Sequence, residues 1–569
     1  MKKRFYLFFI LLMVFLVPAL SSCRYINSLI TIYNEGSTTT KIPNKSITVN
    51  YYVDDTIYKT ETIENRKNFI FPEDPKKEGL NFGGWTYKDS YQTLDINDII
   101  YKDEETLDLY AYFSNGYHFI DNIKRNGPYF KKRSLPSLGS PKVLVVPVNL
   151  GGNTTDEMIS NINKTFNGTS LETGFESVSS YYKKSSNGKL NLQFDIVNEW
   201  FTPKYEPSYY ESYDMNKDKY YDSGSALILN EFINEYDSTY NYSDYDYDND
   251  GYIDAVWMIY NKEPNYSDNT FYWAYVTYTQ NKSKKYDNKY PWSYGFASYD
   301  FIFEKNLAKK YNRELELYYL DDITYDAHTY IHETGHLLGL DDYYDSDSSV
   351  GGKGGIYGAG MMDANQGEMS TIDKILLGWI DPFVSYPTYG VDSYKIKPFS
   401  ESNEVILISK NKPLSVYSEF FLVELYTNTG LNAHDTPIDY PINPLVRQKY
   451  YGLDYSPVYG IRILHVNALM TKDYNGKTYN EYMDFVYNNS NTKSLFVDMI
   501  VNPTYRKYAF ENHGGTKKDI INSLALFTNT SSIIDLKNSS YSMTNQSNIF
   551  FDLKIESISN QEAEIKILY

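Results

Sequence analysis

The sequence predicts a multidomain protein with a small β-rich module, a central α/β (α+β) domain and a β-rich C-terminal domain. The chain has 569 residues, a length typical of roughly three or four domains. Hydrophobic residues make up 42% of the chain, which is enough for packed cores. Strand patterns dominate both ends of the sequence, whereas helix and strand patterns alternate in its middle.

The N-terminus, "MKKRFYLFFILLMVFLVPALSSC", has a basic start and an apolar run, so residues 1–22 are expected to be a signal peptide. The run is short for a membrane span, which needs about 20 residues. The tetrapeptide "LSSC" resembles a bacterial lipobox, which implies cleavage before Cys23 and lipidation of its thiol. The alternative is an ordinary signal peptide with an incidental cysteine. We expect the lipid to hold the protein on the extracellular face of the cell membrane.

Cysteine content and charge exclude several classes of site and partner. Cys23 is the only cysteine, so disulfides within the chain and zinc sites built from thiolates are excluded. Any zinc must be held by His, Asp or Glu. The formal net charge of -19 argues against nucleic acid as a partner, because phosphates would be repelled. The same acidity suits calcium, which takes oxygen ligands.

The first part of the mature chain reads as a tether followed by a small module. Residues 23–45 are rich in Ser, Thr and Asn and predict a tether. Residues 46–114 contain short alternating runs such as "ITVNYYVDD" and "LDLYAYF", which predict strands. With "GLNFGGW" between them, these runs resemble the internalin-type B-repeat, a β-grasp-like module of bacterial surface proteins. A linker containing Pro and Gly is expected over residues 115–139.

Two further domains are expected after the linker. Residues 140–390 open on "KVLVVPVNL", which predicts a buried strand, and include "SGSALILNEFINEYD", which predicts a helix with a Ser/Gly start. Residues 391–569 are dominated by strand patterns such as "SEFFLVELY", "YGIRILHVN" and "EAEIKILY". The central domain is therefore α/β (α+β), and the C-terminal domain is β-rich.

The segment "TYIHETGHLLGL" carries the chemistry that the sequence marks most clearly. If it is a helix, His332 and His336 lie one turn apart on the same face, at a spacing that suits two imidazoles on one zinc ion. Glu333 lies at the edge of that face, where it can reach a zinc-bound water without binding the metal. This is the division of roles in H-E-x-x-H metalloproteases. The alternative is a surface helix with two histidines.

A third zinc ligand is expected just beyond the helix. Gly339 allows the backbone to turn sharply, because glycine adopts positive φ without strain. Asp342 follows His332 by ten residues, where many metzincins carry a third histidine, and a carboxylate is an acceptable zinc ligand. Asp341 is a neighbouring competitor. The spacing favours Asp342.

The glycine-rich stretch "GGIYGAGMMDANQGEMS" follows about 25 residues after the zinc motif. Metzincins place a Met-turn beneath the metal, and Met361 and Met362 are the candidates here. An isolated pair of methionines is more often ordinary core. Next to the zinc motif we favour the Met-turn, and which of the two methionines lies under the metal is left open.

Several separated blocks resemble the immune inhibitor A family of secreted bacterial metzincins. They are "SVSSYYKKSSNGKL", "DAHTYIHETGHLLGLDDYYD" and "GAGMMDAN…LLGWIDP", and the later "EFFLVELYTNTGL…YGIRILHVN" resembles the β-domain of that family. The resemblance covers about residues 135–480. It implies a metzincin-type zinc protease domain and endopeptidase activity, with His332, His336 and Asp342 as ligands and Glu333 as general base. In some other metzincins a tyrosine follows the turn methionine by two residues; Asp363 and Ala364 stand there, so the oxyanion stabiliser is unassigned.

A second metal site is expected in "DYDYDNDGYIDAVW", where oxygen ligands alternate before a turn glycine as in the first part of an EF-hand loop. The bidentate glutamate of an EF-hand is missing, and "AVWMIY" predicts a strand rather than a helix, so this is not an EF-hand. The alternative is an acidic, solvated turn. The candidate calcium ligands are Asp246, Asp248, Asp250, the Tyr252 carbonyl and Asp254.

These observations lead to one favoured function and two rivals. The favoured function is a zinc-dependent, lipid-anchored endopeptidase that acts as a monomer on extracellular proteins or peptides. One rival is a non-catalytic surface adhesion or binding lipoprotein with a calcium-stabilised, protease-like scaffold. The other is a calcium-stabilised structural surface protein without zinc. The complete H-E-x-x-H-x-x-G-x-x-D pattern favours the enzyme, because a degenerate scaffold has no need to keep all of it.

Overall fold

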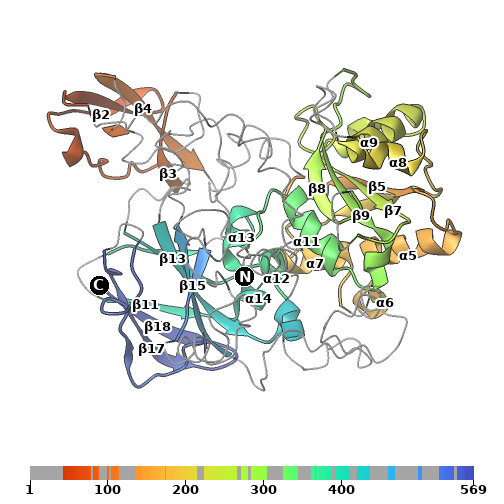
Figure 1. The fold of residues 1–569 in the computed structure, drawn as a ribbon. Helices are drawn as coiled ribbons and strands as arrows, with labels where there is room; N and C mark the ends of the chain where they lie inside the picture. The colour runs from red at the N-terminus through yellow and green to blue at the C-terminus, as the bar shows by residue number, and fades with distance from the viewer. Residues whose placement is uncertain are drawn as a thin grey trace, which may run out of the picture.

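The structure, a computed structural model, combines several β-sheets with helices that cover both faces of one of them (Figure 1). The described residues form two five-stranded and two four-stranded sheets, and three of these contain both parallel and antiparallel pairs. At this level the expected α+β class is confirmed. The structure describes residues 43–77, 81–88, 99–100, 104–114, 135–173, 175–213, 223–265, 271–279, 283–303, 325–343, 356, 360–364, 367–380, 382–387, 391–410, 419–435, 459–467, 497–502, 525–543 and 547–569.

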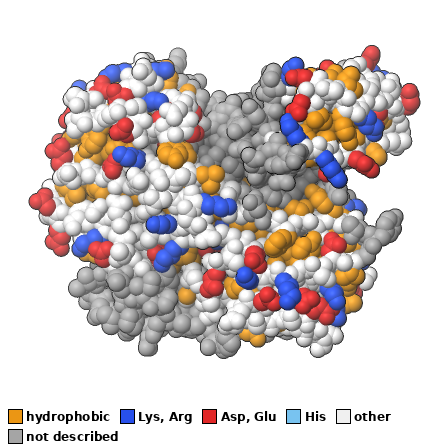
Figure 2. All heavy atoms as spheres, turned by 180° about the vertical axis from the view of Figure 1, so that it is seen from behind, with side chains coloured by type: hydrophobic (Ala, Val, Ile, Leu, Met, Phe, Trp, Pro, Cys, Tyr) orange, Lys and Arg blue, Asp and Glu red, His pale blue; other side chains and the backbone are white. Residues whose placement is uncertain are grey.

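The N-terminal module contains β1 (Ile47–Val53), β2 (Thr56–Ile63), the 3-10 helix η1 (Arg66–Asn68), β3 (Asn81–Thr86) and β4 (Thr106–Ser114). Its sheet has the order β2-β1-β4-β3, with β1 and β4 parallel at the centre. The core surrounds the buried Trp85, whose ring lies 4.7 Å from that of Tyr51 between centroids. Exposed hydrophobic side chains, among them Ile57 and Ile70, gather on this module (Figure 2).

The central sheet positions the candidate site. It contains β5 (Lys142–Val148), β6 (Gln193–Ile196), β7 (Val256–Tyr260), β8 (Tyr275–Tyr278) and β9 (Ser293–Ser298) in the order β6-β5-β7-β9-β8. β8 alone is antiparallel to its neighbour. Val143 and Val145 of β5 join the hydrophobic cluster on one face, and Leu144 and Val146 join the cluster on the other. Because helices cover both faces, β5 reads as one continuous apolar run.

Helices lie on the two faces of this sheet (Figure 1). α8 (Pro207–Glu211) and α9 (Gly224–Glu235) pack on one face, with η2 (Tyr242–Tyr245) beside them. The opposite face carries α5 (Asp156–Asn167), α6 (Ser170–Thr173), α7 (Val178–Ser185), η3 (Tyr299–Phe303) and α11 (His328–Leu337). Beyond them, α12 (Met361–Ala364) packs on α11, and α13 (Thr371–Leu376) packs on β13 (Glu419–Thr427) of the C-terminal part. The expected helix at "SGSALILNEFINEYD" is α9, capped by the side chain of Ser223, which accepts from the Ala226 N–H.

The C-terminal part is built from two further sheets. One contains β10 (Phe383–Ser385), β12 (Ile406–Ser409), β13 (Glu419–Thr427), β14 (Tyr459–Asn467) and β15 (Val497–Ile500), with α14 (Phe399–Ser402) and η4 (Gly430–Asp435) beside it. The other contains β11 (Val391–Ile396), β16 (Ile533–Ile534), β17 (Asp552–Ile558) and β18 (Ala563–Leu568). Phe421 and Leu553 belong to the cluster between the sheets, which therefore form a sandwich.

The other face of the β10-β12-β13-β14-β15 sheet packs toward the candidate site. Phe420 and Leu422 of β13 share one hydrophobic cluster with Tyr330 and Ile331 of α11. The cluster therefore extends across position 390, where the sequence analysis places a domain boundary. That boundary, like the other expected boundaries, stays a prediction. In the described part of the chain, no helix combines the length and hydrophobicity that crossing a bilayer requires.

Candidate metal centre

Helix α11 carries both histidines of the motif and ends in the turn that the sequence predicts. Its first turn is held by Asp326, whose Oδ1 accepts from the His328 N–H at 2.9 Å. At its other end the N–H groups of Gly339 and Leu340 donate to the carbonyls of His336 and Gly335. Gly339 has a φ of +94°, a conformation that favours glycine. The chain therefore reverses immediately after the helix.

The reversal brings Asp342 to the two histidines. The Oδ1 atom of Asp342 lies 3.0 Å from Nε2 of His332 and 3.2 Å from Nε2 of His336. One ligand atom from each of the three side chains lies within 4.8 Å of the others. Asp341, the competitor for the third position, is only half-buried and does not belong to this group. The expected set of three is thus assembled from a helix and the turn that follows it.

Backbone carbonyls orient both imidazole rings. The Nδ1 atom of His332 lies 2.8 Å from the Met361 carbonyl oxygen, and that of His336 lies 2.9 Å from the Leu340 carbonyl oxygen. A carbonyl only accepts, so Nδ1 carries the proton in each neutral ring and Nε2 keeps its lone pair. Metal-binding histidines are commonly fixed in this way. Both Nε2 atoms face the carboxylate of Asp342.

The charges of the site fit a cation between the three side chains. Burial alone would raise the pKa of Asp342, but His336 and His332 hold it well below its usual range. Burial likewise lowers the pKa of His336, but Asp342 outweighs this and raises it to about 10. Without a metal, a proton thus supplies the positive charge that the carboxylate requires. A divalent cation held by two Nε2 atoms and one carboxylate oxygen would take over that role.

Glu333 lies beside this group and is itself buried, with 6% of its surface exposed. Its Oε2 atom has no hydrogen-bond partner among the described residues. Burial raises the pKa of Glu333, and the nearby His336 and His332 oppose this effect. A buried carboxylate oxygen without a hydrogen bond costs free energy of folding, so its presence calls for an explanation such as a catalytic role. Glu333 is therefore suited to receive a proton rather than to stabilise the fold.

Met361 and Met362 contact the candidate site and its helix in different ways. The Met361 carbonyl orients His332, and the Met362 carbonyl accepts from the Tyr343 N–H at 2.9 Å. The Met362 sulfur packs against Gly335, where a Cβ would overlap it. Both methionine side chains are fully buried. Of the two candidates, Met362 is the one whose sulfur lies against the helix between the histidines.

Comparison with protein families and with curated proteins identifies no relative of this chain. No protein-family model matches the chain, and no curated protein is similar enough to it to count as a relative. The resemblance to the immune inhibitor A family therefore stays a prediction that rests on the motifs.

The acidic loop brings together three of its five predicted ligands. Carboxylate oxygens of Asp246, Asp248 and Asp254 lie within 4.8 Å of one another. The Asp250 carboxylate is outside this group, and its Oδ1 accepts from the Tyr252 N–H at 2.9 Å. Short side-chain to backbone bonds of this kind are typical of Asp in turns. The Tyr252 carbonyl as a ligand stays a prediction.

Lys289 already reaches into this loop. Its ammonium group pairs with Oδ2 of Asp246, and the lysine side chain is only 14% exposed. Burial raises the pKa of Asp254 to about 8, with further contributions from Asp248 and Asp246. A calcium ion at the loop would therefore compete with the ammonium group. The sequence analysis did not consider this lysine, because it lies far from the loop along the chain.

The sequence analysis did not identify three buried charged residues that are further functional candidates. Glu368, Asp373 and Lys374 are buried charged residues that follow the two methionines along the chain. The pattern Ser370-x-x-Asp373 marks a capping box, and the structure has one at the start of α13. No local signal marks Glu368 or Lys374, since charged residues are expected at the surface. Cys23 and the signal peptide lie outside the described residues.

Proposed function

We propose that the protein is a zinc-dependent endopeptidase that hydrolyses extracellular proteins or peptides. The observation that carries the proposal is the convergence of His332, His336 and Asp342 beside a buried carboxylate, Glu333, that has an unused oxygen. Two neutral imidazoles and one carboxylate are a donor set that zinc accepts in catalytic sites. The family resemblance of the surrounding sequence blocks supports the same function.

The chain's own residues would hold zinc through Nε2 of His332, Nε2 of His336 and a carboxylate oxygen of Asp342. When bound there, zinc would supply a Lewis acid that polarises the scissile carbonyl and makes water more acidic. The carbonyls of Met361 and Leu340 fix the ring planes, so that little reorientation is needed on binding.

Glu333 would act as the general base and then as the general acid. Its raised pKa makes the buried carboxylate a better proton acceptor than an exposed glutamate. It takes a proton from the attacking water and later gives it to the leaving amine. Both transfers need a carboxylate oxygen that is not already hydrogen-bonded. Among the described residues, Oε2 of Glu333 has no such bond.

An extended peptide is the substrate form that the sheet accommodates. Among the strands of the described residues, β8 stands at the edge of the central sheet, and it packs next to α11. Edge strands carry backbone groups that pair readily with an added strand. A peptide paired along β8 would run beside the helix that carries Glu333. Protein substrates with accessible extended segments would then be preferred over compact ones.

The N-terminal features would place this activity at the cell surface. Lipidation at Cys23 would anchor the chain on the outer face of the membrane, and residues 23–45 would act as a tether. The module that follows, with parallel β1 and β4 at the centre of its sheet, supports the β-grasp-like expectation. A Cys23→Ser variant should move from the membrane fraction to the medium; equal membrane retention of both forms would refute the anchor.

Digestion of a peptide library tests the proposed activity directly. The wild type should cut the library, chelation should abolish cutting, and Glu333→Gln should lower the rate by about 100- to 10,000-fold while metal is still bound. The bonds cut would also reveal the cleavage preference. A wild type that holds zinc but cuts nothing would favour the non-catalytic binding protein. Less than one zinc per chain, unaffected by His336→Ala, would refute the metal centre.

A further inference from the structure

Glu368 and Lys374 form a buried ion pair behind the candidate metal ligands. The Lys374 ammonium lies 3.0 Å from Oε2 of Glu368, and both side chains are at most 1% exposed. Neither residue takes part in the proposed chemistry. Withdrawing two charges from water costs several kcal/mol per ion, so a pair of this kind adds little to stability unless it has further partners.

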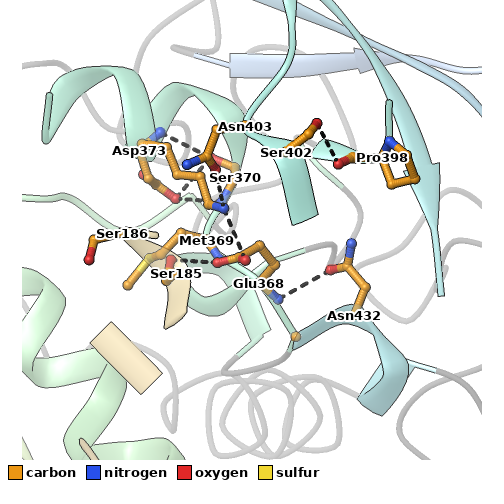
Figure 3. A network of polar contacts seen from close by, with 12 residues as sticks. Ser185, Ser186, Glu368, Met369, Ser370, Asp373, Pro398, Ser402, Asn403 and Asn432 are labelled. Atoms are coloured by element: carbon orange, nitrogen blue, oxygen red, sulfur yellow. Dashed lines mark hydrogen bonds and ion pairs between the residues drawn. The ribbon is translucent and has the colours of Figure 1, made fainter. Parts of the chain in front are cut away.

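Both members of the pair have such partners, and these come from separate parts of the chain. Oε1 of Glu368 accepts from the Ser185 hydroxyl at the end of α7 and from the Met369 N–H. The Glu368 N–H donates to Asn432 of η4 (Figure 3). Lys374 donates to Oδ1 of Asn403 at 3.1 Å, just beyond α14. The pair therefore joins a helix of the central sheet to two segments of the C-terminal part.

The backbone of Glu368 continues this network to the metal site. Its carbonyl accepts from the Met361 N–H at 3.3 Å, and the Met361 carbonyl orients His332. Two hydrogen bonds thus separate a residue fixed by the C-terminal part from the ring of a candidate ligand. Met361 is fully buried, so water does not substitute for these bonds.

A second buried ion pair, Arg462–Glu424, serves as a comparison for the Glu368–Lys374 pair. Arg462 pairs with Glu424 between β14 and β13, and these side chains are similarly buried. Both residues lie within the C-terminal sheet, and among the described residues Glu424 bonds to Arg462 and not to the methionine segment. Arg462 and Lys374 both lie over the Phe399 ring, so the two pairs share a neighbour. They differ in their hydrogen bonds, because Glu368 and Lys374 connect several segments to the carbonyl that holds His332.

We propose that the Glu368–Lys374 pair is a positioning device that holds His332 through the backbone of Met361, so that the docked C-terminal sheet is part of the metal centre. This inference rests on the proposed zinc site. It makes Glu368 and Lys374 positioning residues, because neither touches substrate or metal. Loss of the pair should loosen the Met361 carbonyl, and with it the orientation of the His332 ring.

Cobalt binding to the full chain tests the inference without relying on activity. Co²⁺ is titrated into metal-free protein, and its affinity and visible absorption spectrum are recorded. Glu368→Gln should weaken binding by up to about 10-fold, the lower end of the effect of losing a direct outer partner of a metal ligand, because two hydrogen bonds separate Glu368 from His332. It should also change the spectrum, because the geometry at His332 changes. Glu424→Gln is the matched control and should leave both readouts as in the wild type.

A milder pair of variants guards against loss of folding. Ser185→Ala removes only the hydroxyl that donates to Glu368, and it should weaken cobalt binding in the same direction. Ser179→Ala is its control, because that hydroxyl lies in the same helix but donates to the Leu192 carbonyl. In zinc-loaded protein, Ser185→Ala should lower kcat more than it changes KM, since ligand geometry and not the peptide edge is altered.

The outcomes separate this inference from the proposed function. A wild type that binds cobalt, together with a Glu368→Gln variant of unchanged affinity and spectrum, would overturn the positioning role alone. Equal losses in Glu368→Gln and Glu424→Gln would also overturn it, because general destabilisation would then explain both. A wild type that takes up no cobalt would overturn the metal centre itself, and the positioning role with it.

Discussion

The sulfur of Met362 packs against the backbone of Gly335, on the turn of α11 between His332 and His336. This contact explains why the smallest residue stands at position 335. Gly335→Ala should destabilise the protein by about 1–3 kcal/mol, the usual cost of overpacking a core, and should weaken metal binding. Thermal unfolding of metal-free and zinc-loaded protein measures both effects. Adding Met362→Ala should reduce the penalty of the alanine at 335; purely additive losses would contradict the contact.

The third ligand can be tested with two adjacent aspartates. Asp342 is buried against both histidines, whereas Asp341 is half-buried outside the group. Outer partners of metal ligands typically contribute about 10- to 100-fold in affinity, so Asp342→Asn should cost more than that. Asp341→Asn should bind zinc as the wild type does. Competition with a chelator of known affinity measures both variants, and the reverse ranking would assign the ligand to Asp341.

Asp373 predicts a dependence of stability on pH. Burial raises the pKa of this carboxyl from 3.8 to about 6, despite the nearby Tyr343 hydroxyl and the hydrogen bonds from Ser370, which act in the opposite direction. The folded protein therefore binds this proton more tightly than the unfolded chain does. Below about pH 4 the carboxyl is protonated in both the folded and the unfolded protein, so it does not oppose folding. Between about pH 4 and about pH 6 the unfolded chain loses the proton first, so the free energy of unfolding falls; above about pH 6 it no longer changes on this account.

The metal-free wild type should thus lose up to about 3 kcal/mol relative to Asp373→Asn as the pH rises through this window. Calorimetric unfolding of both proteins at pH values from 4 to 7 measures the difference. Asp156→Asn, at an exposed position, controls for the loss of one carboxylate. Parallel curves for wild type and Asp373→Asn would show that the buried acid does not titrate in this range.

Calcium should compete with Lys289 for the acidic loop. The ammonium group pairs with Asp246, which also belongs to the group of three carboxylates. Lys289→Met removes this competitor and should raise calcium affinity, and calcium at 100 times its Kd should stabilise the loop by about 2.7 kcal/mol. Calorimetric titration measures the binding. Lys284→Met, which breaks an ion pair with Asp237 elsewhere, is the control; no binding in any variant would refute the calcium site.

The features that the sequence predicted well are those fixed by neighbours along the chain. The spacing of His332 and His336 requires only a helix, and the turn at Gly339 requires only a positive φ. Asp342 follows from these two, because the turn leaves few places for a residue three positions later. Strands such as β5 and β14 were likewise visible in local patterns.

The features that the sequence did not reveal depend on contacts between distant segments. Lys289 meets the acidic loop, and Met362 meets Gly335, only after the chain has folded. The Glu368–Lys374 pair resembles ordinary surface charge in the sequence, because burial is set by the C-terminal sheet. For Asp250, the alternation of acidic residues predicted a ligand, whereas in the structure its carboxylate lies outside the group of Asp246, Asp248 and Asp254, and its Oδ1 accepts from the Tyr252 N–H.

The hydrophobic cluster shared by α11 and β13 has a consequence for the order of biosynthesis. The chain is synthesised from its N-terminus, so Tyr330 and Ile331 emerge well before Phe420 and Leu422, with which they share a core. Until β13 follows, α11 lacks the part of its apolar cover that β13 supplies. Under the proposed function, the newly made protein would complete its metal centre only after the C-terminal sheet has emerged, a timing that would delay proteolysis until synthesis is nearly finished.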